Sequence, residues 1–404
     1  MLVVIFADKQ TNLEKYENLN TENVVIYSDE DINTSFNKAD SSDIFIQADV
    51  IILTQNCIKN GQYDIQPIKE ACEVLKEYVL DDKTIIFDTP VPPRTTYKMS
   101  KILDELDLIE DISLAYTTMI TDNTLVIGHT NRKAKDTTIN LYENMADVIK
   151  STDNIQTAEA VPILQNAYKD TLIALANQTS ILSEAITIDL IEAIKLANLD
   201  EDVHLLNPEP VLHENIIRDS SEIIKLADEY GETAQLSQTT RDTNNYVAYH
   251  IAYMAEKELY LKEHLAMFET TVAILGVTED ETLKTQKDNA SLILIDDFVQ
   301  RDVEVWVHDD KVEKDVIEEH GAKKITLDEA YDADCIIIMT DSQEYRNIDP
   351  ERVEKVIITA LPVLESEKFK DKKYSSVGQY RLKRVKCYDT SKTKPDCSGT
   401  IHTT

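Results

Sequence analysis

Glycine is scarce in this sequence. The 404 residues include seven glycines, which stand singly at positions 61, 128, 231, 276, 321, 378 and 399. Average composition would supply about 28. Closely spaced glycines are what allow a backbone to turn sharply and approach a phosphate, as in GxGxxG and P-loop motifs. The sequence therefore excludes the ordinary glycine-rich loops that bind nucleotides.

Cysteine is also scarce, and long apolar runs are missing. The five cysteines include no CxxC pair, so we expect neither a disulfide framework nor a zinc site, and a reducing cytoplasm fits. No apolar run reaches the roughly 18 residues of a membrane span. The chain opens directly on LVVIF without a basic segment before it. These patterns predict a cytoplasmic protein with no membrane span and no export signal.

Positive charge is sparse over most of the chain. Lysine and arginine total 41 against 75 aspartates and glutamates, a net charge of −34. Such a surface repels phosphate backbones, so we expect no nucleic-acid partner for the body of the chain. The end differs, because residues 368–404 carry ten lysines and arginines but three aspartates. Residues 381–404 are therefore interpreted as a basic tail, whose role the sequence leaves open.

Short apolar runs alternate with helical patterns in two parts of the chain. In the first part the runs are LVVIF, VVIYS, ADVIILT and TIIFDTPVP, and in the second they are TVAILGV, VEVWVHDD, ADCIIIMT and KVIITALPV. Continuous apolar strands separated by helices are typical of parallel sheets buried on both faces. Residues between the two parts read as long helices. The pattern predicts an α/β fold with two Rossmann-like parallel-sheet domains, 1–155 and 267–380, joined by an all-helical region, 156–266.

Four segments in this order resemble one family. TIIFDTPVPPRTT resembles a strand followed by an EST-VPPGTT turn, and AEAVPILQNAYKDTLIALANQ resembles AEMVKLxENTYRDxxIALANE. ADCIIIMTDSQEYRNID resembles ADxxVILTEHxEFRxLD, and YSSVG resembles a terminal Y-x-G-I-G. All four belong to the nucleotide-sugar dehydrogenases, the UDP-glucose and UDP-N-acetyl-D-mannosamine 6-dehydrogenase family. The resemblance implies a central helix through which two subunits form a dimer.

The resemblance also implies a chemistry. These enzymes oxidise the C6 alcohol of a nucleotide sugar to a carboxylate by two hydride transfers to NAD. The second transfer proceeds through a thiohemiacetal, so a cysteine thiolate is needed as the nucleophile. A lysine and an asparagine of the central helix, and an aspartate after the cysteine, stabilise the oxyanion and handle protons.

The catalytic positions are only partly retained. The nucleophile segment PGPGVGGHCIPKD corresponds to NPEPVLHENIIRD, which places Asn215 where the cysteine should be. Pro162 stands at the lysine position, whereas Asn166 and Asp219 match the family. An amide is not a nucleophile, and residues that act as a unit fail together. Asn166 and Asp219 can be catalytic remnants or packing residues, and the loss of their partners favours packing.

The ligand-binding positions have changed as well. After LVVIF the glycine loop is lost, and Asp8 lies where pyrophosphate would bind. Arg94 replaces the glycine of the VPPGTT turn. We therefore expect no NAD in the family's mode. In the second sheet domain, Glu279 and Asp280 replace a Phe-Lys pair. A weak UDP-sugar site would rest on three polar residues, namely Lys287, Thr340 and Arg346.

These observations favour a catalytically silent member of the family. It would serve as a structural or regulatory partner, in a homodimer or in a heterodimer with an active paralogue. The alternative is an active NAD-dependent UDP-N-acetylmannosamine or UDP-glucose 6-dehydrogenase of cell-surface polysaccharide synthesis. A third possibility is a module that binds another ligand between the domains.

Overall fold

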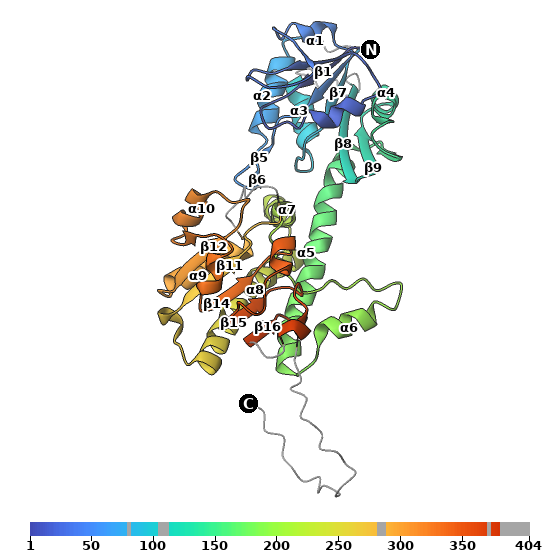
Figure 1. Cartoon of the computed structure of the whole chain (residues 1–404). Coiled ribbons are helices and arrows are strands. Elements are labelled where there is room, and N and C mark those ends of the chain that lie inside the picture. Colours follow the sequence, from blue (N-terminus) through green and yellow to red (C-terminus); the bar gives the residue numbers. More distant parts are fainter. Residues whose placement is uncertain (79–81, 104–112, 281–287, 370–372, 380–404) are drawn as a thin grey trace, which may run out of the picture.

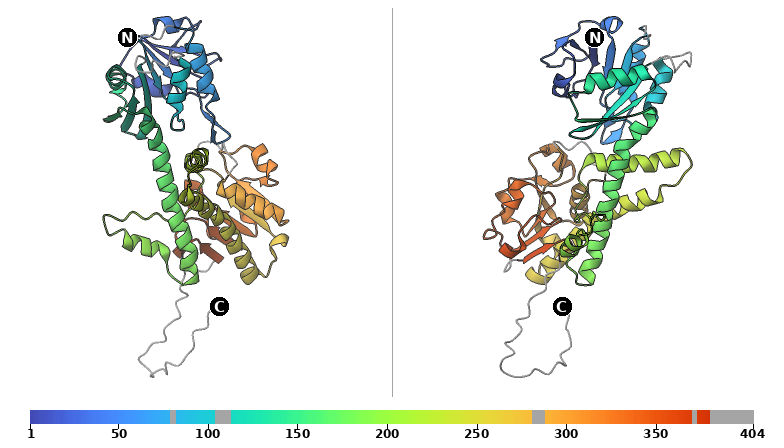
Figure 2. Two further views of the ribbon diagram at one scale, coloured as in Figure 1. Left: turned by 180° about the vertical axis from the view of Figure 1, so that it is seen from behind. Right: turned by 90° about the vertical axis from the view of Figure 1, so that its right-hand side faces the viewer.

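The molecule consists of two sheet domains and a helical region between them (Figure 1). The computed structural model describes residues 1–78, 82–103, 113–280, 288–369 and 373–379, so the basic tail, 381–404, lies outside the described residues. The first sheet domain lies at one end of the long helix α5 (Ile155–Ala185), and the second lies beside the other end. Two further views show that the two sheet domains are separated along this helix (Figure 2).

The first sheet has eight strands in the order β10-β9-β8-β7-β4-β1-β2-β3. Its strands are β1 (Val3–Phe6), β2 (Val24–Tyr27), β3 (Asn37–Lys38), β4 (Val50–Leu53), β7 (Thr84–Phe87), β8 (Ser113–Thr121), β9 (Thr124–His129) and β10 (Val148–Thr152). All neighbours are parallel except β8 and β9, which form an antiparallel pair. The predicted parallel sheet is confirmed, with this one antiparallel pair as an addition.

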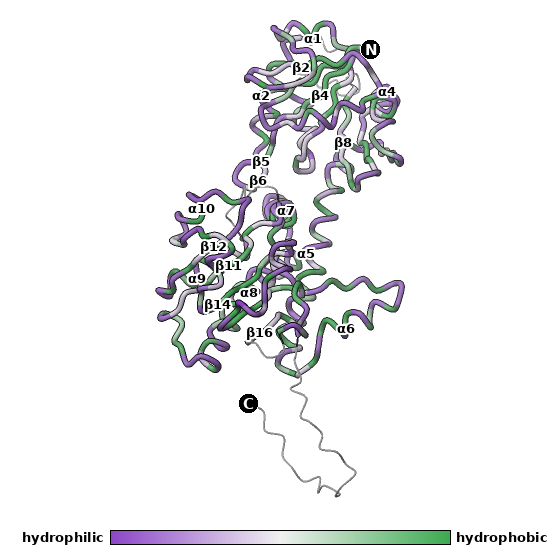
Figure 3. Tube along the Cα trace, in the orientation of Figure 1, coloured by the Kyte–Doolittle hydropathy of each residue, from purple (hydrophilic) through white to green (hydrophobic). Residues whose placement is uncertain are grey.

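Helices cover both faces of this sheet. They are α1 (Ile44–Gln47), α2 (Gln66–Leu75), α3 (Thr95–Leu103) and α4 (Arg132–Tyr142). The strands β1, β4 and β7 are buried along their whole length, because VVIF, VIIL and TIIF meet apolar side chains on both sides. These strands are hydrophobic and the surrounding loops are hydrophilic (Figure 3). The first crossover, from β1 to β2, contains only the 3₁₀ helix η1 (Glu14–Asn18).

A short hairpin projects from the first sheet domain toward the helical region. It is formed by β5 (Ile58–Lys59) and β6 (Gln62–Tyr63), which pair antiparallel. Asn60 and Gly61 form its turn, both with positive φ, as tight hairpin turns require. The β6 strand contacts helix α7 (Glu214–Glu229), so the hairpin joins two regions that are far apart in sequence.

The helical region contains four helices. They are α5, α6 (Leu190–Ala197), α7 and α8 (Gln235–Glu263). Asn154 and Asp189 cap α5 and α6, because each side chain accepts a hydrogen bond from an N–H of the first turn. Helix α5 packs on β8 and β9 at its start and on α7 and α8 further along. It therefore belongs to the cores of both the first domain and the helical region.

The second sheet has six parallel strands in the order β13-β12-β11-β14-β15-β16. Its elements are η2 (Met267–Glu269), β11 (Thr271–Leu275), α9 (Ala290–Gln300), β12 (Glu304–His308), α10 (Lys314–Glu319), β13 (Lys323–Lys324), η3 (Glu329–Asp332), β14 (Cys335–Ile338), α11 (Gln343–Arg346), β15 (Val356–Thr359), η4 (Ser366–Phe369) and β16 (Lys373–Ser376). Helices α8 and α9 pack together over one face, where their apolar side chains join those of the strands in one core. The predicted second Rossmann-like sheet is confirmed.

No helix within the described ranges is both long enough and apolar enough to cross a membrane.

Candidate functional site

Asn166 of α5 and Asp219 of α7, which the resemblance matches to two catalytic positions of the family, lie in direct contact. The Nδ2 of Asn166 donates to Oδ2 of Asp219 at 2.6 Å. The other carboxylate oxygen of Asp219 accepts hydrogen bonds from the Tyr63 hydroxyl at 2.8 Å and from Nε of Arg218 at 2.9 Å. Asp219 is fully buried. Both carboxylate oxygens are therefore engaged, and the aspartate joins three structural elements.

Sequence reasoning missed Tyr63 and Arg218. Tyr63 comes from the β5–β6 hairpin, and the guanidinium of Arg218 lies over its ring at 4.9 Å from the centroid. Burial raises the pKa of Tyr63 well above its usual value, so the hydroxyl stays a donor to Asp219. Arg218 directly precedes Asp219 and could have been noticed. Tyr63 could not, because 156 residues separate it from its partner.

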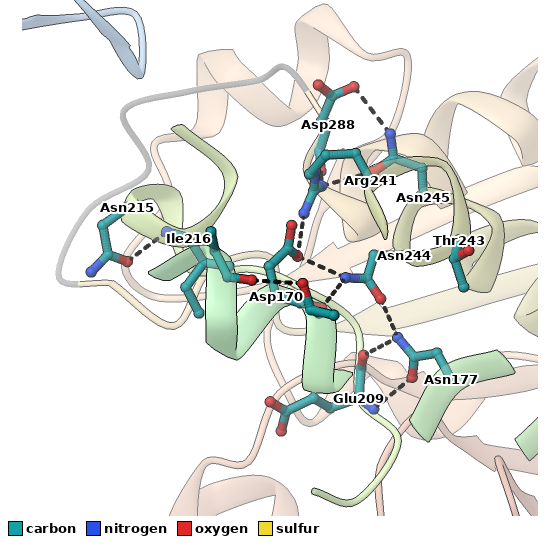
Figure 4. Close-up of polar contacts among 12 residues, drawn as sticks. Asp170, Asn177, Glu209, Asn215, Ile216, Arg241, Thr243, Asn244, Asn245 and Asp288 are labelled. Carbon is teal, nitrogen blue, oxygen red and sulfur yellow. Dashed lines mark hydrogen bonds and ion pairs between the residues drawn. The ribbon is translucent and has the colours of Figure 1, made fainter. Parts of the chain in front are cut away.

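Asn215, at the nucleophile position, does not join this cluster. Its side chain is exposed on the first turn of α7. Its carboxamide oxygen accepts a hydrogen bond from the N–H of Ile216 at 3.0 Å. Figure 4 shows Asn215 at a distance from the buried polar residues of α5 and α8. A side chain in this position and of this type supplies no nucleophile to a buried site.

The N-terminus of α7 is occupied by a carboxylate from the second sheet domain. The N–H of Glu214 donates to Oδ2 of Asp280 at 2.8 Å, and Nδ1 of His213 lies 3.4 Å from the other oxygen. The hydrogen bond with Asp280 raises the pKa of His213. A helix N-terminus favours a negative group, and Asp280 supplies it internally. Asp280, which the resemblance matches to a lysine of the family, thus brings a negative charge to this place.

Pro162 lies inside α5, one turn before Asn166. It provides no cation, and it removes one hydrogen-bond donor from the helix. One turn before Pro162 lies Glu159, which is fully buried and which sequence reasoning did not single out. Its carboxylate accepts hydrogen bonds from the backbone N–H groups of Arg94 at 2.6 Å and Thr96 at 2.7 Å. Burial raises the pKa of Glu159 to about 7, although these hydrogen bonds oppose the shift.

The turn before α3, which Glu159 binds, has the left-handed backbone that glycine favours, although it contains no glycine. Arg94 has φ of 74°, in the left-handed region, where a side chain other than glycine is strained. Its guanidinium donates to the Tyr230 hydroxyl at 2.6 Å and lies over the ring of Tyr97. The turn therefore connects α3 with the end of α7.

In the loop after β1, where the resemblance predicts the pyrophosphate site of the family, the carboxylate of Asp8 accepts several hydrogen bonds. The carboxylate accepts hydrogen bonds from the N–H of Gln10 at 3.0 Å and the hydroxyl of Thr11 at 3.0 Å, and also from the N–H of Asn56. Because η1 is a 3₁₀ helix of five residues, no α-helix starts here to offer its N-terminus to a phosphate. A cavity of about 530 Å³ adjoins the loop. Its charged lining residues are Lys9, Glu14, Glu17 and Asp31.

The predicted UDP-sugar residues of the second sheet domain are not free. Thr340 is buried against Gly276, where an added Cβ would lie 2.1 Å from its hydroxyl oxygen. The guanidinium of Arg346 forms two hydrogen bonds with Asp341. Lys287 lies outside the described residues. Arg346 and Asp341 also line a cavity of about 720 Å³ at the carboxyl ends of β14 and β15.

The carboxyl edge of the second sheet is acidic. Burial raises the pKa of Glu209, and the nearby Glu279 and Asp341 raise it further. Asp280 lies beside Glu279, and Asp309 binds the N–H groups of the loop after β11. Negative side chains at this edge oppose the binding of an anionic nucleotide.

A buried polar network fixes the segment that precedes α7. Figure 4 shows hydrogen bonds running from Arg241 through Asp170 and Asn244 to Asn177. Asn177 then pairs with both backbone groups of Glu209, at 2.9 and 3.0 Å. Sequence reasoning missed this network, although it holds the glycine-free segment in a single path. Oδ2 of Asp170 and Nε of Arg241 have no hydrogen-bond partner among the described residues, but the paired groups of the network favour one arrangement.

Comparison with known proteins agrees with this architecture. Residues 156–246 match the UDP-glucose/GDP-mannose dehydrogenase family, central domain, and residues 273–370 match its UDP binding domain. A UDP-N-acetyl-D-mannosamine dehydrogenase of Methanocaldococcus jannaschii is 27% identical over 330 residues, covering 79% of this chain and 73% of that protein. The corresponding protein of Methanococcus vannielii is 24% identical, covering 72% of this chain and 67% of that protein.

Solved structures share the fold. The UDP-D-ManNAc dehydrogenase of Pyrococcus horikoshii superposes with a TM-score of 0.77 at 19% identity, covering 94% of this chain and 99% of that chain. An NDP-N-acetyl-D-galactosaminuronic acid dehydrogenase of Methanosarcina mazei gives 0.78 at 16% identity, covering 94% and 95%. With the two matched domains in order and sequence relatives over most of its length, this chain belongs to the nucleotide-sugar dehydrogenase family.

Proposed function

We propose that this chain has lost the family's oxidation chemistry and acts as a structural or regulatory partner. The observation that carries the proposal is the nucleophile position, which holds the exposed amide of Asn215. Within the described residues the cysteines are Cys57, Cys72 and Cys335, and all are buried. Burial raises the pKa of the Cys57 thiol to about 12. A thiolate that could form the thiohemiacetal is therefore not available from these three residues.

The changes at the two ligand-binding edges support the same proposal. The carboxylate of Asp8 takes the donors next to the lost glycine loop. Asp280 takes the N-terminus of α7. Both places would meet the negative phosphates of NAD or of a UDP-sugar, and both already hold a negative side chain. Weak binding of a UDP-sugar through Thr340 and Arg346 would first require Arg346 to leave Asp341.

The partner surface that we propose is formed by α5 and α8. Helix α5 exposes Leu164, Tyr168, Leu175 and Leu182, and α8 exposes Tyr246, Tyr249, Tyr253 and Tyr260. Each set recurs at intervals of three, four or seven residues, which places it on one face of its helix. Such a face is typical of a helix that packs against another subunit. We propose that it pairs with a second copy of this chain or with an active paralogue in the cytoplasm.

One group of residues supports the alternative that the chain is an active enzyme. Glu159, Asn166 and Asp219 all retain family identities, and the pKa of Glu159 lies near 7, where a carboxyl group can exchange protons. Under this alternative the chain would oxidise UDP-N-acetylmannosamine or UDP-glucose with NAD for cell-surface polysaccharide synthesis.

Enzyme assay separates the two functions. The purified chain is incubated with NAD and each of the two UDP-sugars, and NADH is followed by absorbance. We expect no NADH above a no-enzyme control, and we expect none from the Asn215→Cys variant, since the surrounding segment differs as well. Family-like turnover by the unmodified chain would overturn the proposal.

The mass of the assembly in solution tests whether the chain pairs with a partner. Light scattering of the purified chain gives a dimer if the partner is a second copy and a monomer if it is a paralogue. Tyr168→Asp should disrupt the assembly, whereas Met119→Asp, which changes an exposed side chain of β8 in the first sheet domain, should not. If neither self-association nor a co-purified paralogue depends on Tyr168, the surface assignment is wrong.

A further inference from the structure

Three side chains in the second sheet domain converge at a place that neither the family pattern nor the proposed function uses. His308 ends β12, Asp310 follows two residues later, and Glu344 lies in α11. One ligand atom from each residue lies within 4.8 Å of the others. The sequence alone predicted no metal site, because these residues show no ligand spacing. The fold brings them together at the carboxyl edge of the sheet, because His308 is the last residue of β12.

The hydrogen bonds around His308 assign its tautomer. The hydroxyl of Tyr345 donates to the backbone oxygen of His308 at 2.9 Å. The same hydroxyl lies 2.9 Å from Nδ1 of the ring. A phenol has one proton, so its oxygen must accept from Nδ1, and Nδ1 carries the hydrogen. In the neutral ring, Nε2 therefore carries a lone pair.

That lone pair faces negative groups. Nε2 lies 3.8 Å from Oδ1 of Asp310 and makes no hydrogen bond to any described residue. His308 is 5% exposed, so its ring is fixed by packing and by Tyr345. The carboxylates of Asp310 and Glu344 likewise accept no hydrogen bond from the part of the chain that the structure describes. With the ring neutral, these three acceptor atoms repel one another, and a cation among them removes the repulsion.

We propose that His308, Asp310 and Glu344 bind a divalent transition-metal cation of the zinc class. One imidazole nitrogen and two carboxylate oxygens are ligands that Zn²⁺ accepts, and the two carboxylates balance its charge. Metal–ligand bonds of about 2.0–2.2 Å require the three atoms to approach one another more closely. Both carboxylates can move, since the side chain of Asp310 is 84% exposed and Glu344 is exposed too.

Tyr345 has a positioning role in this site. Metal-binding histidines almost always donate their second ring N–H to an oxygen, which orients the ring and fixes the tautomer. Here the Tyr345 hydroxyl is that oxygen, and the ring is held in place before any metal binds. Two further acidic groups act on Tyr345, namely Asp309 and Glu279, and they increase the local attraction for a cation.

Zinc binding to the full chain tests the proposal. Reactive thiols are first alkylated with iodoacetamide to remove thiolate sites elsewhere, and Zn²⁺ is then titrated by isothermal calorimetry. We expect one zinc per chain at this site. Asp310→Asn and Glu344→Gln should each weaken it by at least about tenfold, since each removes one ligand. Both residues are exposed, so the variants should fold normally.

Matched controls are available on the neighbouring helix α10. Asp315→Asn and Glu319→Gln remove the same charge from exposed positions in the same domain, and should leave the affinity within about twofold. Tyr345→Phe should weaken binding by about 10- to 100-fold. In ¹⁵N spectra, zinc should shift Nε2 of His308 while Nδ1 keeps its proton.

Three results would overturn the site. They are an absence of zinc binding, zinc binding that Asp310→Asn and Glu344→Gln leave unchanged, and a His308 ring that carries a proton on Nε2 in saturating zinc. The last would show that His308 and Asp310 form an ion pair only.

Discussion

Asp219 joins α5, α7 and the β5–β6 hairpin, and its replacement by asparagine should destabilise the protein strongly. Its side chain is 1% exposed, and that of its ion-pair partner Arg218 is 9% exposed. The Asp219→Asn variant would keep the shape of the side chain but would lose the charge that balances Arg218. Breaking a buried ion pair by neutralising one partner costs about 3–5 kcal/mol. The new amide would also place its N–H₂ group against one of the three donors to Asp219, namely Asn166, Tyr63 or Arg218. Two donors facing each other form no hydrogen bond.

The hairpin's share of this energy can be measured separately. Tyr63→Phe removes one hydrogen bond to a charged acceptor, which should cost about 1.5–3 kcal/mol. Because Tyr63 and Asp219 contact each other directly, the double variant should lose less stability than the sum of the single variants, by about 1 kcal/mol. Asp228→Asn changes an exposed aspartate of the same helix, and should stay within about 0.5 kcal/mol of the parent.

Urea unfolding provides the assay. Far-UV circular dichroism follows all helices, whereas fluorescence of Trp306, the single tryptophan, follows the second sheet domain. Coincident transitions would justify a two-state free energy. A loss below about 1 kcal/mol for Asp219→Asn, or strict additivity with Tyr63→Phe, would refute the conclusion that this carboxylate anchors the three elements.

Three further outcomes follow from the site. The pKa of Glu159 is raised from 4.5 to about 7 in the folded protein, so ionising this carboxyl group opposes folding. The free energy of unfolding should therefore fall as pH rises from 4.5 to about 7. Glu159→Gln should remove this dependence and flatten the pH profile of the urea midpoint. Since Arg94 has a positive φ, Arg94→Val should be less stable than Arg94→Gly by about 1–2 kcal/mol in the same assay, and equal stabilities would contradict the left-handed turn. Asp280→Asn should lower the pKa of His213 toward 6.5, because the Asp280 hydrogen bond raises it; an NMR titration that finds no change would show that the contact is absent in solution.

The strands and the domain order could be predicted because continuous apolar runs have few alternatives to a sheet buried on both faces. VVIF, VIIL and TIIF are buried strands of the first sheet, as their composition indicated. Strand β8 was not predicted, since SLAYTTMIT mixes polar and apolar residues and its second half is exposed. Its antiparallel pairing with β9 is a local hairpin, because only Asp122 and Asn123 join the two strands. This short polar connection is a hairpin signal that was present in the sequence.

The site was predictable only where a residue could be read at its position in a motif. Asn215 and Pro162 are visible as substitutions, but the contact between Asn166 and Asp219 requires the packing of α5 on α7. The roles of Tyr63 and Glu159 depend on partners 156 and 63 residues away. The sequence shows that position 94 lacks the glycine of the family's turn. It does not show that the backbone there stays left-handed. That conformation is held by Glu159, which binds the N–H groups of Arg94 and Thr96 and lies far away in sequence.

The β5–β6 hairpin has a mechanical consequence. If α5 were the only connection, the first sheet domain could rotate about it as about a hinge. Tyr63 provides a second attachment at Asp219, away from the helix axis. Arg94 provides a third, through its hydrogen bond to the Tyr230 hydroxyl at the end of α7. Rotation of the first sheet domain about α5 therefore requires hydrogen bonds at two places on α7 to break. The contacts of the hairpin and of Arg94 with α7 thus oppose rotation of the first sheet domain relative to the helical region.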